Sequence, residues 1–582
     1  MRARSLRRLI IASVTAVLLA AVLAAVYVGV RAMQAREEMA AASAAASRAS
    51  AALAAQDLAG AADAVATMSA HAAAVDVGHD PVWRLAEAIP GAGANLAAVR
   101  VAASGLARLG TDVAEPLLEV SQELAGADTA TAAAVLQSAA SRLRAADEVR
   151  AAVQRDLAGI DRGALISEVA RGVDSLTDVL ATAEPATSAA AQAAALLPQI
   201  LGVDGPRTVL VVVQNTAELR TGGGITGTFV QVNADAGRLS IAAIRDSTSF
   251  APAAEPLLPL RAGEQQSFGD GIGRFVQDAS MTADFTLTAQ LASAWWQSAT
   301  SVQPDVVLSV DPLVMAAVLR ATGPVETAAG PLTADDVVTR LLVDPYLTLT
   351  AEEQSSRFAD AATAVFAALV ERADPLVLAS ALQGPISEGR VSVWSARPEE
   401  QAVIGGTALA GPLSRQQQAG DGAFAVYFND ASGGKLTPYL HVGLGIGTES
   451  CREDERQDVV VTVDLGSAMP GDAAATLPTS VTGGGIWGAA SGDIAPTVTV
   501  VAPRGWFLGG VTLDGELVPS VAVVDDEQPA VTRRTDLAPG RARTLAFRFI
   551  APDESPVDPV LLHTPLLAAP DAITPAEACA TS

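Results

Sequence analysis

Hydrophobic and polar positions change their spacing twice along the chain, and these changes predict three zones. The first 201 residues hold an uncharged apolar run and then alanine-rich stretches without strand alternation, a pattern that favours helices. From residue 202 to 410, β-branched runs typical of strands mix with helical patterns. From residue 411 onwards, short strand patterns separated by Gly, Pro and Asp turns dominate. We therefore expect a multidomain α+β protein.

The apolar run over residues 9–30 predicts a single transmembrane helix. Its 22 residues span about 33 Å at 1.5 Å per residue, which is enough to cross a bilayer. Four arginines precede the run, so residues 1–8 are expected in the cytoplasm and the bulk of the chain outside it. A cleaved signal peptide is the alternative, because alanine-rich stretches follow the run. The expected localisation is the cell membrane, as a single-pass protein.

Residues 31–201 predict a helical stalk or bundle. Heptads with leucine at both core positions are not sustained, so a packed bundle with small, alanine-lined contacts is favoured over a partner-binding coiled coil.

Residues 202–410 predict a central mixed α/β domain of ordinary size. Its expected strands are Thr208–Gln214, Thr228–Asn233, Arg238–Arg245 and Val306–Val310, and its expected helices are Thr286–Thr300, Pro312–Ala321, Asp335–Val343 and Glu352–Arg372. The tandem Trp295-Trp296 lies in an alanine-rich helical pattern, where tryptophan is more often core than ligand-binding.

Residues 411–551 predict a C-terminal β-sandwich, because short strands recur between turns. These strands are Val459–Leu465, Thr497–Ala502, Phe507–Leu513, Val521–Asp525 and Thr544–Ile550. Residues 552–582 form a proline-rich tail that we expect to be loosely attached.

Charge and composition narrow the function. The net charge is -26, which argues against a nucleic-acid partner. Lys435 is the only lysine, so lysine chemistry is excluded elsewhere, and the four histidines are too scattered for a histidine-rich metal site. Cys451 and Cys579 form an even pair in a chain expected to be exported, which predicts a disulfide, with two unpaired thiols as the alternative.

A glycine-rich loop follows the first predicted strand of the central domain. Its glycines formally match the dinucleotide-binding spacing G-x-G-x-x-G, but that fingerprint needs a helix after the glycines and a strand is expected there. The loop is therefore interpreted as one that needs positive φ or close backbone approach. The glycines concerned are Gly222, Gly223, Gly224 and Gly227.

Three arginines in the central domain are candidates for an anion site. Arg220 lies in the glycine loop, Arg245 precedes Asp246 at a strand end, and Arg357 lies in a predicted helix. Arginine binds phosphate bidentately, and the neighbouring carboxylate could hold a divalent cation. An ordinary surface pair of Arg245 with Asp246 is the alternative, and the sequence does not show whether the three arginines converge.

The same segments carry a family resemblance. Val212 to Gly227, with Q-N-T-A-E-L-R-T-G-G-G-I-T-G, resembles the signature of the bacterial domain-of-unknown-function family 4012, which is typical of actinobacterial envelope proteins. The resemblance continues through Arg245-Asp246-Ser247-Thr248, Met281 to Phe285, Val310-Asp311-Pro312, Trp394-Ser395 and Phe428 to Lys435.

The central domain also resembles, more weakly, the LytR-CpsA-Psr domain. Enzymes of that type move glycans from polyprenyl pyrophosphate onto peptidoglycan. The resemblance implies pyrophosphate binding by Arg220, Arg245 and Arg357, catalytic roles for Arg245 and Asp246, and Mg²⁺ held by Asp246. It departs at Thr221-Gly222, where that family has a metal-binding aspartate, and at Ala361-Ala362, where a second arginine is expected.

Two functions follow. The first is a membrane-anchored extracytoplasmic envelope protein that binds or transfers polyprenyl-pyrophosphate-linked glycan, with lipid-linked glycan and peptidoglycan as partners and glycan phosphotransfer as its activity if it is an enzyme. The second is a non-catalytic scaffold that binds other envelope proteins. A soluble hydrolase is disfavoured, because the adjacent Asp335 and Asp336 would point about 100° apart on a helix.

Overall fold

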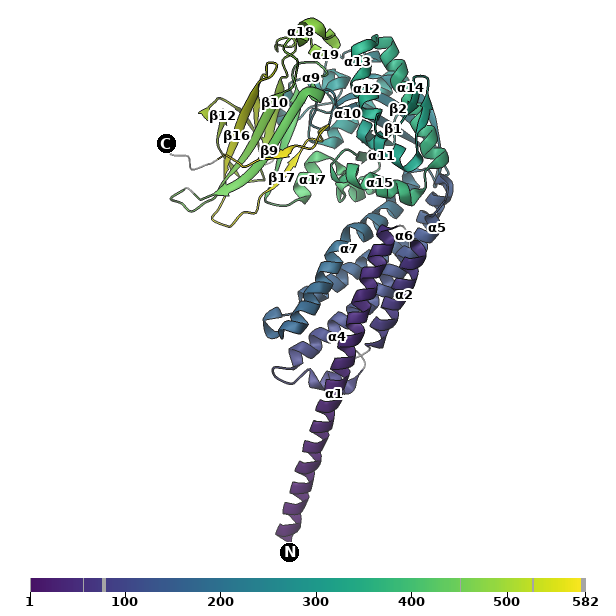
Figure 1. Cartoon of the computed structure of the whole chain (residues 1–582), viewed down its shortest axis with the longest axis vertical. Helices are drawn as coiled ribbons and strands as arrows, with labels where there is room; N and C mark the ends of the chain where they lie inside the picture. Colours follow the sequence, from purple (N-terminus) through teal and green to yellow (C-terminus); the bar gives the residue numbers. More distant parts are fainter. Residues whose placement is uncertain (1, 56, 76–79, 451, 526–527, 577–582) are drawn as a thin grey trace. The chain divides into compact units, whose positions relative to one another are not determined.

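The computed structural model describes residues 2–55, 57–75, 80–450, 452–525 and 528–576 (Figure 1). It is a mixed α+β structure with an N-terminal apolar helix and several sheets. The chain divides into two compact units, Met1–Ala127 with Thr131–Pro198 and Asp128–Ala130 with Gln199–Ser582.

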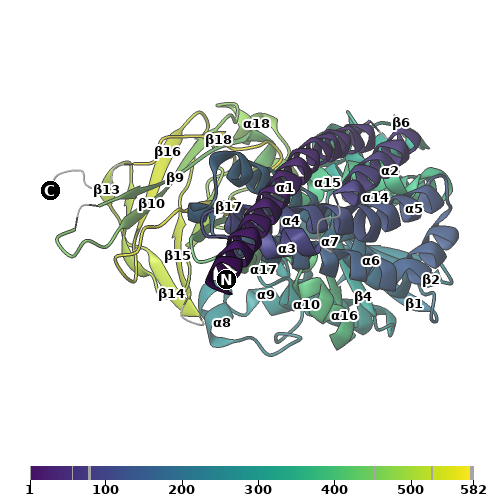
Figure 2. The same ribbon diagram turned by 90° about the horizontal axis from the view of Figure 1, so that it is seen from below.

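Within its described residues, every regular element of the first unit is a helix. Its first helix, α1, is a single continuous ribbon in Figure 2. Within α1, Ser13–Ala49 is long and apolar enough to cross a membrane, and a signal sequence would pass the same test. Small side chains such as Ala45, Ala102 and Ala146 fill its largest core, with leucines such as Leu157. The helices are α1 (Arg2–Ala54), α2 (Leu58–Ala74), α3 (Pro81–Ala86), α4 (Gly93–Arg108), a π-helical turn (Leu109–Ala114), α5 (Glu115–Leu124), α6 (Thr129–Ala158) and α7 (Ser167–Ile200).

The second unit begins with a five-stranded sheet in the order β3-β2-β1-β4-β7. Strands β1 and β4 run parallel, and the other neighbours are antiparallel. The strands are β1 (Arg207–Asn215), β2 (Ile225–Asp235), β3 (Arg238–Asp246), β4 (Val306–Val310) and β7 (Ser392–Ser395). Strand β2 begins at Ile225, directly after the glycines, so a strand follows the glycine loop as expected.

Helices cover both faces of this sheet. On one face, Phe229 packs against Trp295 and Trp296 of α10 (Phe285–Thr300), and Trp296 is 0% exposed, which confirms that the tandem tryptophans are core. On the other face, Val213 packs with a cluster built from α11 (Pro312–Thr322), α12 (Val337–Leu342) and α14 (Ala351–Arg372). The other elements of this part are α8 (Ala262–Phe268), α9 (Gly271–Arg274), α13 (Asp344–Thr348), α15 (Pro375–Ser387), α16 (Pro398–Gly405), α17 (Pro412–Gln418) and the hairpin β5 (Val325–Thr327) and β6 (Gly330–Leu332).

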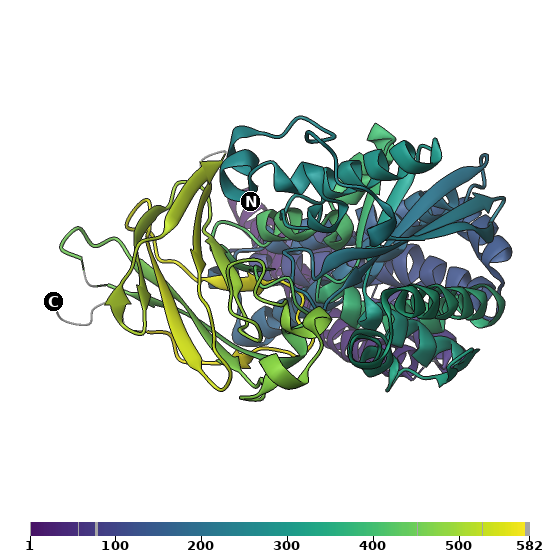
Figure 3. The same ribbon diagram turned by 90° about the horizontal axis from the view of Figure 1, so that it is seen from above.

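Two further sheets follow, six-stranded in the order β13-β12-β16-β10-β9-β18 and five-stranded in the order β14-β15-β11-β8-β17. They are the green and yellow strands in Figure 3. Phe428, Val459 and Phe547 belong to one core that both sheets share. The strands are β8 (Ala423–Asp430), β9 (Leu440–Glu449), β10 (Asp458–Ser467), β11 (Pro496–Val501), β12 (Phe507–Leu513), β13 (Glu516–Leu517), β14 (Val521–Asp525), β15 (Gln528–Arg534), β16 (Ala542–Ile550), β17 (Val560–His563) and β18 (Asp571–Ala572), with α18 (Ala473–Thr476) and α19 (Thr479–Thr482).

The expectation of a loosely attached tail is wrong for its described residues. Strand β17 pairs in parallel with β8, and β18 pairs in parallel with β9. Thr564 is fully buried, accepts a 3.0 Å hydrogen bond from the Phe428 amide and donates one of 3.3 Å to the Thr221 carbonyl. The prolines limit the tail to short strands, yet they leave enough backbone groups to pair with the sheets. The predicted Cys451–Cys579 disulfide lies outside the described residues.

Candidate functional site

A cavity of about 270 Å³ lies where β1 and β3 end and β2 begins. Strand β1 is parallel to β4, and ligands of open α/β sheets often bind at the carboxyl ends of such strands. Most of the wall is apolar, and its larger side chains come from the sheet and from helices α11, α12 and α14: Val213, Ile225, Met315, Leu341, Leu342 and Phe358.

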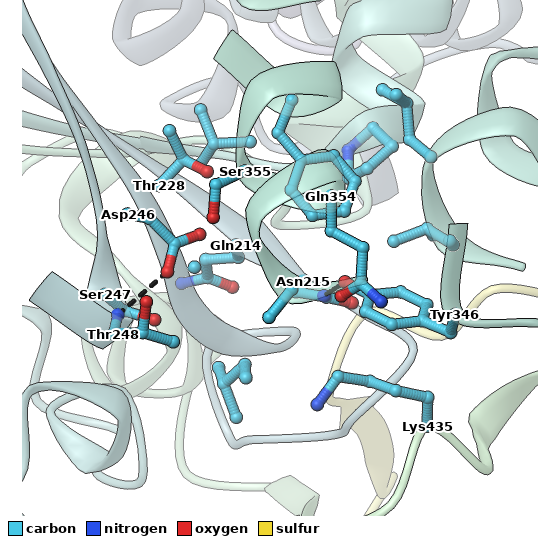
Figure 4. Close-up of a pocket in the computed structure, with 18 of the residues that line it drawn as sticks. Gln214, Asn215, Thr228, Asp246, Ser247, Thr248, Tyr346, Gln354, Ser355 and Lys435 are labelled. Atoms are coloured by element: carbon cyan, nitrogen blue, oxygen red, sulfur yellow. Dashed lines mark hydrogen bonds between the residues drawn. The ribbon is translucent and has the colours of Figure 1, made fainter. Parts of the chain in front are cut away.

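Polar side chains line the remaining part of the cavity (Figure 4). Asp246 ends β3 and lies opposite Thr228 in register, so both side chains share the cavity face of the sheet. The Asp246 carboxylate accepts a 2.8 Å hydrogen bond from the Thr248 amide, which holds it at the strand end. The full polar set is Gln214, Asn215, Thr228, Asp246, Ser247, Thr248, Tyr346, Gln354, Ser355, Lys435 and Ser480.

Tyr346 of α13 contacts residues of two signature segments, Asn215 in one and Lys435 in the other. The Asn215 side-chain nitrogen donates a hydrogen bond to the Tyr346 hydroxyl. Burial raises the pKa of Tyr346 well above its ordinary value, so the hydroxyl stays protonated. The Lys435 ammonium lies 5.6 Å from the centre of the Tyr346 ring, within cation–π distance, and also pairs with the Glu218 carboxylate. Lys435 is the only cation among the described lining residues.

Arg220 lies beside this cavity, but internal partners occupy both terminal nitrogens of its guanidinium group. Its side chain is 8% exposed and pairs with Glu218 at 3.1 Å and with Asp278 at 2.9 Å. It also donates to the backbone carbonyls of Leu219 at 2.9 Å and Asp430 at 3.2 Å. Burial raises the pKa of Glu218, but Lys435 and Arg220 outweigh it and hold that pKa below its ordinary value.

The same contacts join the glycine loop to strand β8. The Asp430 amide donates to the Leu219 carbonyl at 2.9 Å. The Asn429 side-chain oxygen accepts from the Thr221 amide at 3.1 Å, and its nitrogen donates to the Thr221 hydroxyl at 3.1 Å. The signature segments around residues 220 and 430 therefore act first as a buried joint between the central sheet and the C-terminal sheets.

Glycine is required in this joint for backbone reasons. Gly223 has a φ of 123°. A Cβ on Gly224 would lie 2.3 Å from the backbone carbonyl carbon of Asn215. Both the positive φ and the close approach predicted for the loop are present. The Gly222 amide donates to the Ser280 carbonyl at 3.2 Å, and Gly227 lines the cavity.

Arg245 and Arg357 lie elsewhere. Arg245 is opposite Phe229 in register, so its side chain lies on the α10 face of the sheet, away from the cavity face that Asp246 occupies. On α14 the cavity side is marked by Gln354, Phe358 and Ala362, and Arg357 lies about a third of a turn from the middle of that side. Within the described residues, neither arginine has a hydrogen-bond or ion-pair partner. The structure brings Asp246, but none of the three arginines, into the lining of the cavity.

The cavity residues do not fit a resident magnesium ion. Asp246 is the only carboxylate among the described lining residues. No group of three or more His, Cys, Asp or Glu side chains that could hold a metal lies together in the described part of the chain. Magnesium is usually held by one or two carboxylates together with substrate phosphates, so Asp246 alone does not make up a site.

Asp430 makes stability depend on pH. Burial, followed by the charge of Glu218, raises the pKa of Asp430 from 3.8 to about 6. Between these two values the unfolded chain has lost a proton that the folded chain keeps, so this group lowers the free energy of unfolding as pH rises from about 4 to about 6. We expect Asp430→Asn to remove that loss, so that the variant gains stability relative to the native chain across this window. Denaturation at a series of pH values measures it, and a difference that does not change with pH contradicts the assignment.

Apart from Asp246 and the glycine loop, sequence reasoning missed the residues that surround the cavity. Tyr346, Gln354 and Met315 come from three helices, and their convergence depends on helix packing that no local pattern encodes. Lys435 could have been recognised as a site residue, because it is the chain's only lysine and lies in the signature segment Phe428 to Lys435.

Fold and site together define a class, a mixed α+β protein with one candidate membrane span and a small amphipathic cavity beside a glycine-rich loop. Residues 204–346 match the model of a family described as "Protein of unknown function (DUF4012)", which confirms the family assignment made from the signature segment. The match contains β1 to β4, the glycine loop and Tyr346, and ends before α14 and Lys435. No curated protein and no solved structure matches the chain.

Proposed function

We propose that the protein is a membrane-anchored, extracytoplasmic protein of the bacterial cell envelope that binds a polyprenyl-pyrophosphate-linked glycan in the cavity of the central domain. Helix α1 supports the anchor, with its amino-terminal arginines on the cytoplasmic side. In this proposal the two C-terminal sheets act as a β-sandwich domain and residues 31–201 as a stalk.

The main observation behind this proposal is the amphipathic lining of the cavity. An apolar wall with Met315, Leu342 and Phe358 suits part of a prenyl chain, and the polar set around Asp246 suits a head group rich in hydroxyls. A volume of about 270 Å³ is slightly below the range of about 300–1,000 Å³ that is usual for ligand pockets. The cavity therefore suits the first part of a prenyl chain and its head group.

The charges argue against transfer. The guanidinium of Arg220 is already paired with Glu218 and Asp278, and Lys435 is paired with Glu218. A transferase needs cations free to neutralise a pyrophosphate leaving group, and none of the three candidate arginines lines the cavity. We therefore propose binding, presentation or handover of the lipid-linked glycan as the activity.

The scaffold function is the second candidate, and the exposed apolar residues of two edge strands favour it. Strands β13 and β14 lie at the edges of the two C-terminal sheets, and Leu517, Val521 and Val524 are more than half exposed there. Edge strands with exposed apolar side chains are surfaces on which another protein can pair.

Binding of a short-chain analogue tests the proposed function. We expect full-length protein in lipid nanodiscs to bind farnesyl pyrophosphate and farnesyl-pyrophosphoryl N-acetylglucosamine in calorimetric titrations. Asp246→Ala should weaken binding of the sugar-bearing compound about tenfold, because it removes a partly buried hydrogen-bonding carboxylate. Arg245→Ala is the matched control, one residue away on the opposite face of the sheet, and should bind like the native chain. Loss of binding in Arg245→Ala together with normal binding in Asp246→Ala would contradict the cavity assignment and restore the arginine site.

A further inference from the structure

Two large apolar side chains stand exposed at the tip of one loop, between α19 and β11. Ile486 is 77% exposed and Trp487 is 64% exposed. The flanking Gly485 and Gly488 have φ values of 75° and 81°, which residues other than glycine rarely adopt. The backbone is therefore shaped to hold the Ile-Trp pair outwards, although burying it would stabilise the fold.

The loop lies at the rim of the cavity. A Cβ on Gly433 would lie 2.3 Å from Cδ1 and 2.6 Å from Nε1 of Trp487, so the edge of the indole ring rests directly on Gly433. Gly433 and Lys435 both line the cavity, and the Lys435 amide donates to the Val481 carbonyl at 2.9 Å. The contact uses one edge of the indole ring, and 64% of Trp487 remains exposed next to Gly433, a residue of the cavity wall.

A sugar ring matches this combination of groups. A pyranose has an apolar face of C–H groups and a periphery of hydroxyls, so it is bound where a flat aromatic surface lies next to hydrogen-bonding side chains. Trp487, which rests on the lining residue Gly433, offers the flat surface, and the lining residues Asp246 and Gln354 offer the hydrogen bonds. Because Lys435 is already paired with Glu218, recognition of the head group depends more on its hydroxyls than on its charge.

A lipid surface fits the loop less well. Membrane-binding apolar segments carry basic residues that meet anionic lipid. Arg534 lies 3.8 Å from the Cβ position of Gly488, but it pairs with Asp536 at 2.9 Å. The chain as a whole has a net charge of -26, which opposes adsorption to such a surface.

We propose that Trp487 is the stacking platform for a sugar ring at the mouth of the cavity, with Ile486 extending its apolar surface. This inference rests on the proposed function and names the part of the ligand that the rim recognises. Selectivity for the ligand then comes from contacts with its sugar and not from contacts with its prenyl chain alone.

Three ligands test the inference on the full chain in nanodiscs. They are farnesyl pyrophosphate, the same lipid carrying N-acetylglucosamine, and the same lipid carrying galactose. We expect the native chain to bind both sugar-bearing compounds more tightly than farnesyl pyrophosphate. Trp487→Ala should lose this preference, about tenfold in affinity, and should bind farnesyl pyrophosphate unchanged. Trp487→Phe retains an aromatic face and should restore most of the preference.

The outcomes separate the two proposals. If Trp487→Ala keeps the preference for sugar, the stacking role is overturned while the proposed function stands. If the native chain binds none of the three compounds, the proposed function fails and the inference fails with it. If Trp487→Ala keeps the preference, and anionic vesicles shift the tryptophan fluorescence of the native chain but not that of the variant, the Ile-Trp pair is a membrane contact and the sugar platform is overturned. The thermal midpoint of the variant checks that an exposed substitution leaves the fold intact.

Discussion

Arg220→Ala is expected to destabilise the second unit by about 3–5 kcal/mol, the usual cost of removing one partner from a buried ion pair. The substitution leaves the Asp278 carboxylate without its cation, leaves Glu218 with Lys435 alone, and removes the donors to two backbone carbonyls. The loss should appear as a lower denaturant midpoint for unfolding of this unit, followed by fluorescence of the buried Trp295 and Trp296.

Arg245→Ala is the matched control for this experiment. Arg245 has no ion-pair partner in the described part of the chain, so its removal should change the free energy of unfolding by no more than about 0.5 kcal/mol. The LytR-CpsA-Psr resemblance implies a different result, in which both arginines bind pyrophosphate and neither matters for folding. An Arg220→Ala variant of native stability that has lost ligand binding would therefore favour the resemblance over the buried joint.

Ala362→Phe is expected to weaken ligand binding at least about tenfold, while it leaves folding nearly unchanged. Ala362 lines the cavity from α14, and a phenyl ring at this position has open space to enter. The ring would occupy the apolar part where we propose that the prenyl chain lies. Calorimetric titration with farnesyl pyrophosphate measures the effect.

Thr363→Phe provides the matched control, one residue further along the same helix. Thr363 is exposed, and its hydroxyl donates to the Ala359 carbonyl at 2.8 Å, so the same added ring points into solvent. Equal binding by the two variants would exclude the cavity as the binding site. Weaker binding by Ala362→Phe alone would support it, provided that the two variants unfold at similar temperatures.

Local sequence patterns predicted most of the elements of the central sheet. The β-branched run in β1 and the alanine-rich pattern around Trp295 and Trp296 each carry their own signal, because strand alternation and helix periodicity are local. The attachment of the tail was not predictable in this way. Strands β17 and β18 are short, and each pairs with a strand that lies more than a hundred residues earlier.

In the candidate site, too, local features could be predicted from the sequence and long-range contacts could not. The glycine loop was interpreted correctly, because the requirement for a helix after the dinucleotide fingerprint can be tested on the sequence. The pairing of Arg220 could not be foreseen, since Asp278 is 58 residues away and Asp430 is 210 residues away. The separation of Arg245 from Asp246 was open to prediction, because adjacent residues of a strand point to opposite faces.

A chain of 582 residues with a single lysine has one side-chain amine, and that amine lies in the cavity wall. Reductive methylation with isotope-labelled formaldehyde would place a spectroscopic reporter at Lys435, with the amino terminus as the one other reactive amine. The chemical shift of the methylated amine would then respond to any molecule that enters the cavity, whether or not its identity is known. The scarcity of lysine thus offers a direct route to screen for the ligand.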